Sequence, residues 1–234
     1  MTAVLTDIEG TTTDIAFVHK VLFPYARERM AEFVRARANE REVSACLAEI
    51  DEIEHRKVPL EDAIALLIAW SDADRKIKPL KTIQGLIWTD GYKEGALKAH
   101  VYADVVPALR RWHDSGIKLY VYSSGSIAAQ KLLFAHTDAG DLTPLFSGYF
   151  DTGTGAKTVS QSYDRIAEEI GEPPPEILFL SDNIKELEAA QAADLRCVLF
   201  DRARARDAAP GTRNSFPVVS GFHQVNPEAK GGVV

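Results

Sequence analysis

Acidic side chains directly follow a short apolar run near the start of the chain. Val4 and Leu5 lead into Asp7, and Glu9 and Gly10 come shortly after it. Ligands of open α/β sheets bind outside the carboxyl ends of the strands, so carboxylates at this position are placed where chemistry can occur. A turn that ends a strand produces the same pattern, and this segment alone therefore does not establish a site.

Polar groups also follow three later apolar runs. In chain order they are Ser123 with Ser124, Lys157, and Asp182. Transfer of a phosphoryl group requires an in-line nucleophile, positive charge for the equatorial oxygens and an acid for the leaving oxygen. Carboxyl groups and a lysine can meet these requirements, so the four segments together indicate phosphoryl transfer.

The order of these groups resembles the haloacid dehalogenase superfamily of aspartyl phosphotransferases. Glu9 stands where most members of that superfamily carry Asp, and in this respect the chain resembles the enolase-phosphatase family of methionine salvage. The resemblance extends from residue 4 to about 220. Its other segments are 18–26 (VHKVLFPYA), 79–91 (PLKTIQGLIWTDG), 122–133 (YSSGSIAAQKLL), 145–151 (LFSGYFD) and 177–182 (ILFLSD).

The resemblance implies a role for each polar group. Asp7 would be the nucleophile and form an aspartyl-phosphate that water then cleaves. Glu9 would protonate the departing oxygen and later activate water, which requires a carboxyl pKa raised toward neutrality. Lys157 would neutralise Asp7 and the transferring group as a point charge. Ser123 and Ser124 would bind the phosphate at the start of a helix, where the dipole favours anions.

One Mg²⁺ per subunit is the implied cofactor. Its expected ligands are the Asp7 carboxylate, the backbone carbonyl of Glu9 and the Asp182 carboxylate, because Mg²⁺ prefers oxygen ligands. Glu186 lies one helical turn after Asp182 and would bind the metal directly or support one of its ligands. A helix cap explains Asp182 equally well when its segment is taken alone, and the preceding strand together with Asp7 favours the metal site.

The implied substrate is 2,3-diketo-5-methylthiopentyl 1-phosphate, which is enolised and then dephosphorylated to the acireductone. The proton to be removed lies on the phosphate-bearing carbon beside a ketone, which a metal ion or a nearby donor can polarise. Glu9 is one candidate for the base, and a residue of the helical insertion described below is the other.

Three other functions share part of this pattern. A Mg²⁺-dependent phosphomonoesterase acting on another small phosphate ester would keep the same core residues. A hydrolytic dehalogenase needs neither a carboxyl group at Glu9 nor a metal. A non-catalytic phosphate-binding protein could keep the fold without the reaction.

The periodicity of apolar residues predicts two parts of the chain. Residues 14–100 carry apolar positions at helical spacing with no convincing strand, and helices and strands alternate after them. Alternation of this kind implies parallel strands joined by right-handed crossovers. We expect an α/β fold with a doubly wound parallel-sheet core, residues 1–13 and 101–234, and an inserted all-helical cap, residues 14–100, that acts as a lid. An edge strand is expected at Val218–Val219.

Composition limits the partners. The net charge of −7 over 234 residues argues against a sequence-independent polyanion partner, and the arginines at 202, 204 and 206 are expected on a solvated loop. Cys46 and Cys197 have no ligand-spaced partner, which indicates buried thiols in a reducing compartment. No apolar stretch approaches the roughly 18 residues of a membrane span. We therefore expect a cytoplasmic monomer that binds a small phosphorylated molecule and neither nucleic acid nor membrane.

Overall fold

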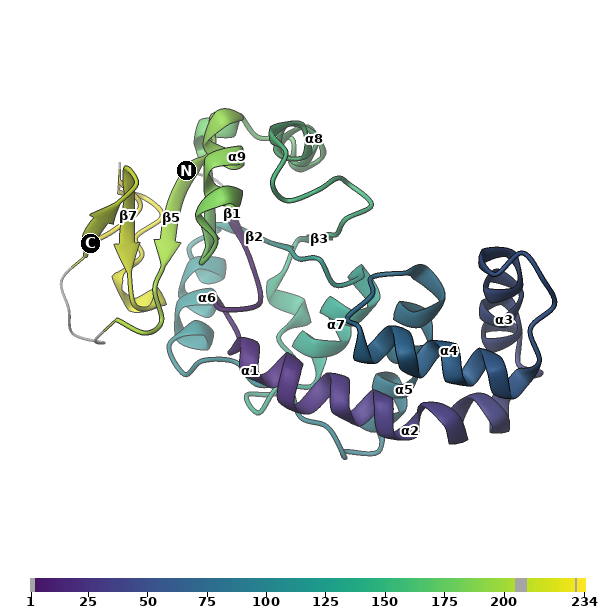
Figure 1. The fold of residues 1–234 in the computed structure, drawn as a ribbon. Helices are drawn as coiled ribbons and strands as arrows, with labels where there is room; N and C mark the ends of the chain where they lie inside the picture. The colour runs from purple at the N-terminus through teal and green to yellow at the C-terminus, as the bar shows by residue number, and fades with distance from the viewer. Residues whose placement is uncertain (1–2, 205–209, 230) are drawn as a thin grey trace. The chain divides into compact units, whose positions relative to one another are not determined.

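The computed structural model describes residues 3–204, 210–229 and 231–234 (Figure 1). The chain divides into two compact units, one made of Met1–Ile15 with Ala99–Val234 and the other of Ala16–Lys98. The first unit is an α/β unit, and every regular element that lies wholly in the second is helical. The assignment of catalytic-core and cap roles to the two parts of the chain stays a prediction.

A single seven-stranded sheet lies at the centre of the α/β unit, with the strand order β3-β2-β1-β4-β5-β7-β6. Every neighbouring pair is parallel except β6 with β7, which confirms the predicted parallel-sheet core. The strands are β1 (Ala3–Thr6), β2 (Lys118–Tyr122), β3 (Gly148–Phe150), β4 (Ile177–Ser181), β5 (Arg196–Phe200), β6 (Gly211–Arg213) and β7 (Phe216–Val219).

The first strand lies between β2 and β4, which is the point where the strand order reverses. Thr6 of β1 is in register with Val121 on one side and Leu180 on the other. The residues that follow these three positions therefore reach the same level at the carboxyl ends of the strands. This is the position at which open α/β sheets bind ligands.

Helices cover both faces of the sheet, as near-continuous apolar strands require. Leu5, Tyr122 and Phe179 face one core, which includes residues of α8 and α9. Val4 and Leu178 point to the opposite face and pack with α6 and the short helix η4. The helices of this unit are α6 (Val105–Asp114), α7 (Ile127–Ala135), η2 (Thr143–Leu145), α8 (Ser160–Ile170), η3 (Pro174–Glu176), α9 (Ile184–Ala192) and η4 (Phe222–Gln224).

The expected edge strand at Val218–Val219 is wrong in its position. These residues belong to β7, which pairs with β5 on one side and with β6 on the other, so β6 forms the edge. The hairpin between β6 and β7 turns through Asn214 and Ser215, both with positive φ. Two left-handed residues give a turn whose twist matches that of the strands, and this turn brings the polar segment β6 into the sheet.

The second unit is a packed group of helices. Met30, Ile50, Leu67 and Ile83 are among the residues that form its buried core, one from each long helix. Its elements are the π-helix η1 (Val18–Leu22), α2 (Phe23–Arg37), α3 (Arg41–Ile53), α4 (Leu60–Asp72) and α5 (Lys78–Lys93), and the short helix α1 (Ile15–Phe17) precedes η1. Among the described segments, no helix combines the length and apolar composition needed to cross a membrane.

Candidate active site

Asp7 lies directly beyond the end of β1 and is almost fully buried, with 3% of its surface exposed. Its backbone N–H donates to the carbonyl of Leu180 at 2.9 Å, which continues the pairing of β1 with β4 by one residue. The next residues form a tight turn in which the Ile8 carbonyl accepts from the N–H groups of Thr11, Thr12 and Thr13. The hydrogen-bonded pairing of β1 with β4 therefore extends to Asp7, and the turn begins directly after it.

The turn after Asp7 brings Asp182 close. Gly10 has a φ of +74°, and a Cβ at this residue would lie 2.0 Å from Oδ2 of Asp182. Glycine is required here both for its backbone conformation and for the space that its missing side chain leaves. Two acidic residues 175 positions apart in the sequence thus belong to one site.

Lys157 supplies positive charge to this site. Its Nζ lies 2.6 Å from Oδ1 of Asp7 and 2.7 Å from Oε2 of Glu186, and all three side chains are largely buried. Burial alone would lower the pKa of Lys157, but the adjacent Asp7 and Glu186 carboxylates raise it above its ordinary value. The ammonium therefore keeps its charge and binds two carboxylates at once.

Glu186 is held as a partner of Lys157. Its carboxylate also accepts hydrogen bonds from Ser181 Oγ at 2.9 Å and from Asn183 Nδ2 at 3.2 Å. Burial and the nearby charge of Asp7 raise the pKa of Glu186, while Lys157 opposes this shift. The sequence placed Glu186 near a metal ligand, and the structure adds a direct ion pair with the lysine.

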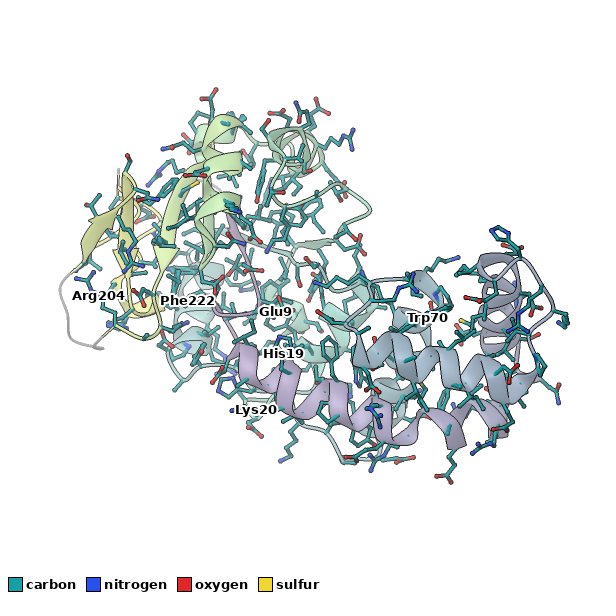
Figure 2. All side chains as sticks on the ribbon, viewed as in Figure 1. Glu9, His19, Lys20, Trp70, Arg204 and Phe222 are labelled. Atoms are coloured by element: carbon teal, nitrogen blue, oxygen red, sulfur yellow. The ribbon has the colours of Figure 1, made fainter. Side chains whose placement is uncertain are left out.

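Glu9 and Ser123 lie together beyond the ends of β1 and β2. Ser123 Oγ donates to Oε2 of Glu9 at 3.3 Å and accepts from the N–H of Gly125 at 3.1 Å. Burial and the neighbouring Asp7 carboxylate raise the pKa of Glu9, whose place at the end of β1 is marked in Figure 2. A carboxyl group in this environment can hold a proton at higher pH than an exposed glutamate, as a general acid must.

Ser124 is half-buried in the loop that leads into α7. The helix begins after Ser126, whose Oγ accepts from the N–H of Ala129 at 3.3 Å. Asp151, which follows β3, accepts from the N–H of Ile127 at 3.1 Å. Asp151 and Ser126 thus bind N–H groups of the first turn of α7. Phosphate binding by Ser123 and Ser124 stays a prediction, and it would take place in the loop before this helix.

The charges around Asp7 suit a divalent cation. Four carboxyl groups, those of Asp7, Glu9, Asp182 and Glu186, lie close enough to influence one another, and two of them contact the ammonium of Lys157. Loss of hydration and the charges of Asp7 and Glu186 raise the pKa of Asp182 to about 6. An oxygen-only donor set with excess negative charge is what Mg²⁺ prefers.

No group of three His, Cys, Asp or Glu side chains within the described ranges has the arrangement of a metal site. The expected site does not require one, because it combines the carboxylates of Asp7 and Asp182 with the main-chain carbonyl of Glu9. Water and phosphate oxygens usually supply the remaining ligands of Mg²⁺.

The expectation that Arg202 lies on a solvated loop is wrong. Its guanidinium contacts Asp104 at 2.9 Å, donates through Nε to the Thr11 carbonyl at 3.0 Å, and is largely buried. Arg202 follows β5, so it lies beyond the carboxyl end of a strand, as the other polar groups do. Its hydrogen bond to the Thr11 carbonyl stabilises the turn after Asp7. Arg204 is partly exposed, and residue 206 lies outside the described residues.

Comparison with known proteins agrees with this geometry. The haloacid dehalogenase-like hydrolase family model matches residues 1–194. Enolase-phosphatase E1 of Parvibaculum lavamentivorans is 54% identical over 207 residues, covering 88% of each chain. Enolase-phosphatase E1 of Klebsiella oxytoca is 52% identical over 227 residues, covering 97% of each chain.

Two solved structures also resemble this chain. The UTR4 protein of Saccharomyces cerevisiae superposes with a TM-score of 0.75 at 36% identity, covering 86% of this chain and 89% of that chain. CbbY of Rhodobacter sphaeroides, solved with phosphate, has a TM-score of 0.56 at 17% identity over 94% of each chain and shares the fold alone. The chain belongs to the haloacid dehalogenase-like hydrolases. Within them it belongs to the enolase-phosphatase E1 family, which confirms the relationship predicted from the sequence.

Proposed function

We propose that this chain is a Mg²⁺-dependent enolase-phosphatase of methionine salvage. It enolises 2,3-diketo-5-methylthiopentyl 1-phosphate and then hydrolyses the phosphate ester to give the acireductone. The observation that carries this proposal is the buried contact between Lys157 and Asp7 at 2.6 Å, with the partly buried Glu9 two residues from the nucleophile. Membership of the enolase-phosphatase E1 family supports the choice of substrate.

Phosphoryl transfer begins with Asp7. One carboxylate oxygen attacks phosphorus, the bond to the ester oxygen breaks, and Glu9 donates its proton to that departing oxygen. Lys157 holds the attacking carboxylate in place and offsets the negative charge of the transferring group. Glu9 then removes a proton from water, which attacks the aspartyl-phosphate and releases inorganic phosphate.

Ser123 and Ser124 bind the phosphate oxygens. The Ser123 hydroxyl is buried next to Glu9, and Ser124 lies in the same loop before α7. Mg²⁺ would be held by the carboxylates of Asp7 and Asp182 and the carbonyl of Glu9, and when bound it supplies positive charge to the phosphate oxygens.

Enolisation requires a base for the proton on the phosphate-bearing carbon. Glu9 is the candidate in the α/β unit, because the same carboxyl group then carries protons in both steps. A residue of the unit Ala16–Lys98 is the alternative. Glu9→Asp shortens this side chain by one methylene group and tests whether its length matters. Wild-type rates of both enolisation and dephosphorylation would show that the extra length is irrelevant.

The experiment follows ultraviolet absorbance and phosphate release together during turnover of the diketone phosphate. An absorbing enolised intermediate is expected to rise before phosphate appears. Rapid turnover of simple sugar phosphates with no turnover of the diketone would favour a phosphomonoesterase of other specificity. Activity that survives complete chelation of metal would instead favour dehalogenase-type chemistry.

The monomeric state and the cytoplasmic location are further parts of the proposal. Light scattering during size-exclusion chromatography tests the first, with one chain of 25.7 kDa as the expected species. Cell fractionation tests the second.

A further inference from the structure

Four successive backbone carbonyls in the loop before α8 each accept a hydrogen bond from a side chain. This segment, residues 154–157, ends with Lys157. The donors are Arg165 Nη1 to Thr154 at 2.9 Å, Tyr122 Oη to Gly155 at 2.9 Å, Ser162 Oγ to Ala156 at 2.8 Å and Tyr163 Oη to Lys157 at 2.6 Å. Side chains here supply the hydrogen-bond donors that backbone N–H groups supply to carbonyls in helices and strands.

The loop has an unusual backbone that explains this arrangement. Gly155 has a φ of +153°, and a Cβ at this residue would lie 2.1 Å from Ser162 Oγ. The segment runs between β3 and α8 without joining a sheet or a helix, and among its four carbonyl groups that of Ala156 also accepts from a backbone N–H, that of Val159 at 3.0 Å. Three hydroxyl groups donate to these carbonyls at consecutive positions.

The three hydroxyl donors lie in regular, buried elements of the α/β unit. Tyr122 ends β2, Ser162 and Tyr163 lie in the first turns of α8, and none of them is more than 2% exposed. The rings of Tyr122 and Tyr163 pack edge to face at 5.6 Å. Burial raises the pKa of both tyrosines, so both hydroxyls stay protonated and can donate.

We propose that Tyr122, Ser162 and Tyr163 are positioning residues that set the place of the Lys157 ammonium between Asp7 and Glu186. A lysine has a flexible four-carbon side chain, so its backbone must be fixed for Nζ to lie within 2.7 Å of two carboxylates. The effect expected on turnover rests on the proposed function, whereas the effect on the loop does not.

The first test replaces Tyr163 with Phe, which removes one hydroxyl and keeps the ring. Tyr149→Phe is the matched control, because the Tyr149 hydroxyl is buried and has no hydrogen-bond partner among the residues that the structure describes. Tyr163→Phe is expected to lower kcat for the diketone phosphate by about 10- to 100-fold, as displacement of a catalytic group does. Tyr149→Phe is expected to stay within about twofold of wild type.

A double-mutant cycle separates positioning from general damage. If Tyr163 acts through Lys157, Tyr163→Phe causes no further loss of kcat in a Lys157→Ala background. An equal loss in both backgrounds, or full activity of Tyr163→Phe, would overturn the inference while leaving the proposed function intact. Ser162→Ala serves as the second variant if Tyr163→Phe does not fold.

Hydrogen–deuterium exchange of peptides covering residues 152–159 tests the same inference without turnover. Faster exchange in Tyr163→Phe than in wild type and Tyr149→Phe is the expected result. Unchanged exchange would overturn the inference. If wild type failed to hydrolyse the substrate, the proposed function would fail, and this exchange measurement would still decide whether the hydroxyl groups hold the loop.

Discussion

The ammonium of Lys157 lies 2.6 Å from Oδ1 of Asp7, although 150 positions separate the two residues in the sequence. An ionised carboxylate is costly to bury unless a partner compensates its charge. Lys157 provides that compensation, and its side chain is buried as well. The ion pair therefore offsets the cost of burying Asp7 at the end of β1.

Replacing Lys157 with Met removes the charge and keeps most of the side-chain volume. Turnover is expected to fall by at least about 100-fold, because a preorganised charge next to the transferring group is lost. The free energy of unfolding is expected to fall by about 3–5 kcal/mol, because Asp7 and Glu186 then lack their buried partner. Steady-state kinetics and urea unfolding measure the two effects. Lys185→Met, at an exposed lysine of α9, is the control and should change neither quantity. Near-normal turnover of Lys157→Met would contradict the role assigned to Lys157 in phosphoryl transfer.

A pair of glycine substitutions tests the approach of Asp182 to the turn after Asp7. Gly10 and Gly116 both have positive φ, but only at Gly10 would a Cβ meet another atom, Oδ2 of Asp182 at 2.0 Å. Gly116→Ala is expected to cost about 1 kcal/mol of stability from backbone strain alone. Gly10→Ala should cost clearly more and should also weaken Mg²⁺ binding measured by calorimetry. Equal costs with unchanged Mg²⁺ affinity would show that the two residues do not pack together.

The raised pKa of Asp182 predicts how stability depends on pH in the absence of metal. Between pH 3.8 and about 6 the folded protein holds a proton that the unfolded chain has released. The contribution of Asp182 to the free energy of unfolding therefore falls as pH rises through this window. Asp182→Asn lacks this proton, so its stability relative to wild type should increase from pH 4 to 6 in buffer with chelator. A difference that stays constant with pH would contradict the shifted carboxyl group.

Mg²⁺ is expected to offset the loss of stability that the raised pKa of Asp182 causes in the absence of metal. Binding of the ion to the folded state should raise the melting temperature of wild type as the Mg²⁺ concentration increases. Asp182→Asn should lose most of this response, whereas Asp164→Asn, at an exposed residue of α8, should keep it. Differential scanning fluorimetry over a Mg²⁺ series measures the effect. An undiminished response in Asp182→Asn would remove this residue from the predicted ligands.

The sequence predicted the sheet because its buried parallel strands are continuous apolar runs. The runs that end at Asp7, Ser123 and Asp182 became the neighbouring strands β1, β2 and β4 at the switch point of the sheet. Chain order and strand register together determine which residues lie at the ends of the strands. A pattern of apolar residues can reveal both.

Contacts made by long polar side chains could not be predicted in the same way. Glu186 follows Asp182 by one helical turn, a spacing that does not show which side chain it faces, and its ion pair with Lys157 forms only in the folded chain. Arg202 lies among charged residues that resemble a solvated loop, and only the folded chain brings Asp104 beside it. The β6–β7 hairpin depends on two left-handed residues that no apolar pattern marks.

Rapid-quench trapping is the most direct test of Asp7 as the nucleophile. The enzyme is mixed with substrate labelled at the phosphate, quenched in acid within milliseconds, digested and analysed by mass spectrometry. The expected result is a labelled peptide containing residues 3–14 with the phosphate on Asp7, and no such peptide from Asp7→Asn. Turnover by wild type with no acyl-phosphate at Asp7 would contradict the mechanism.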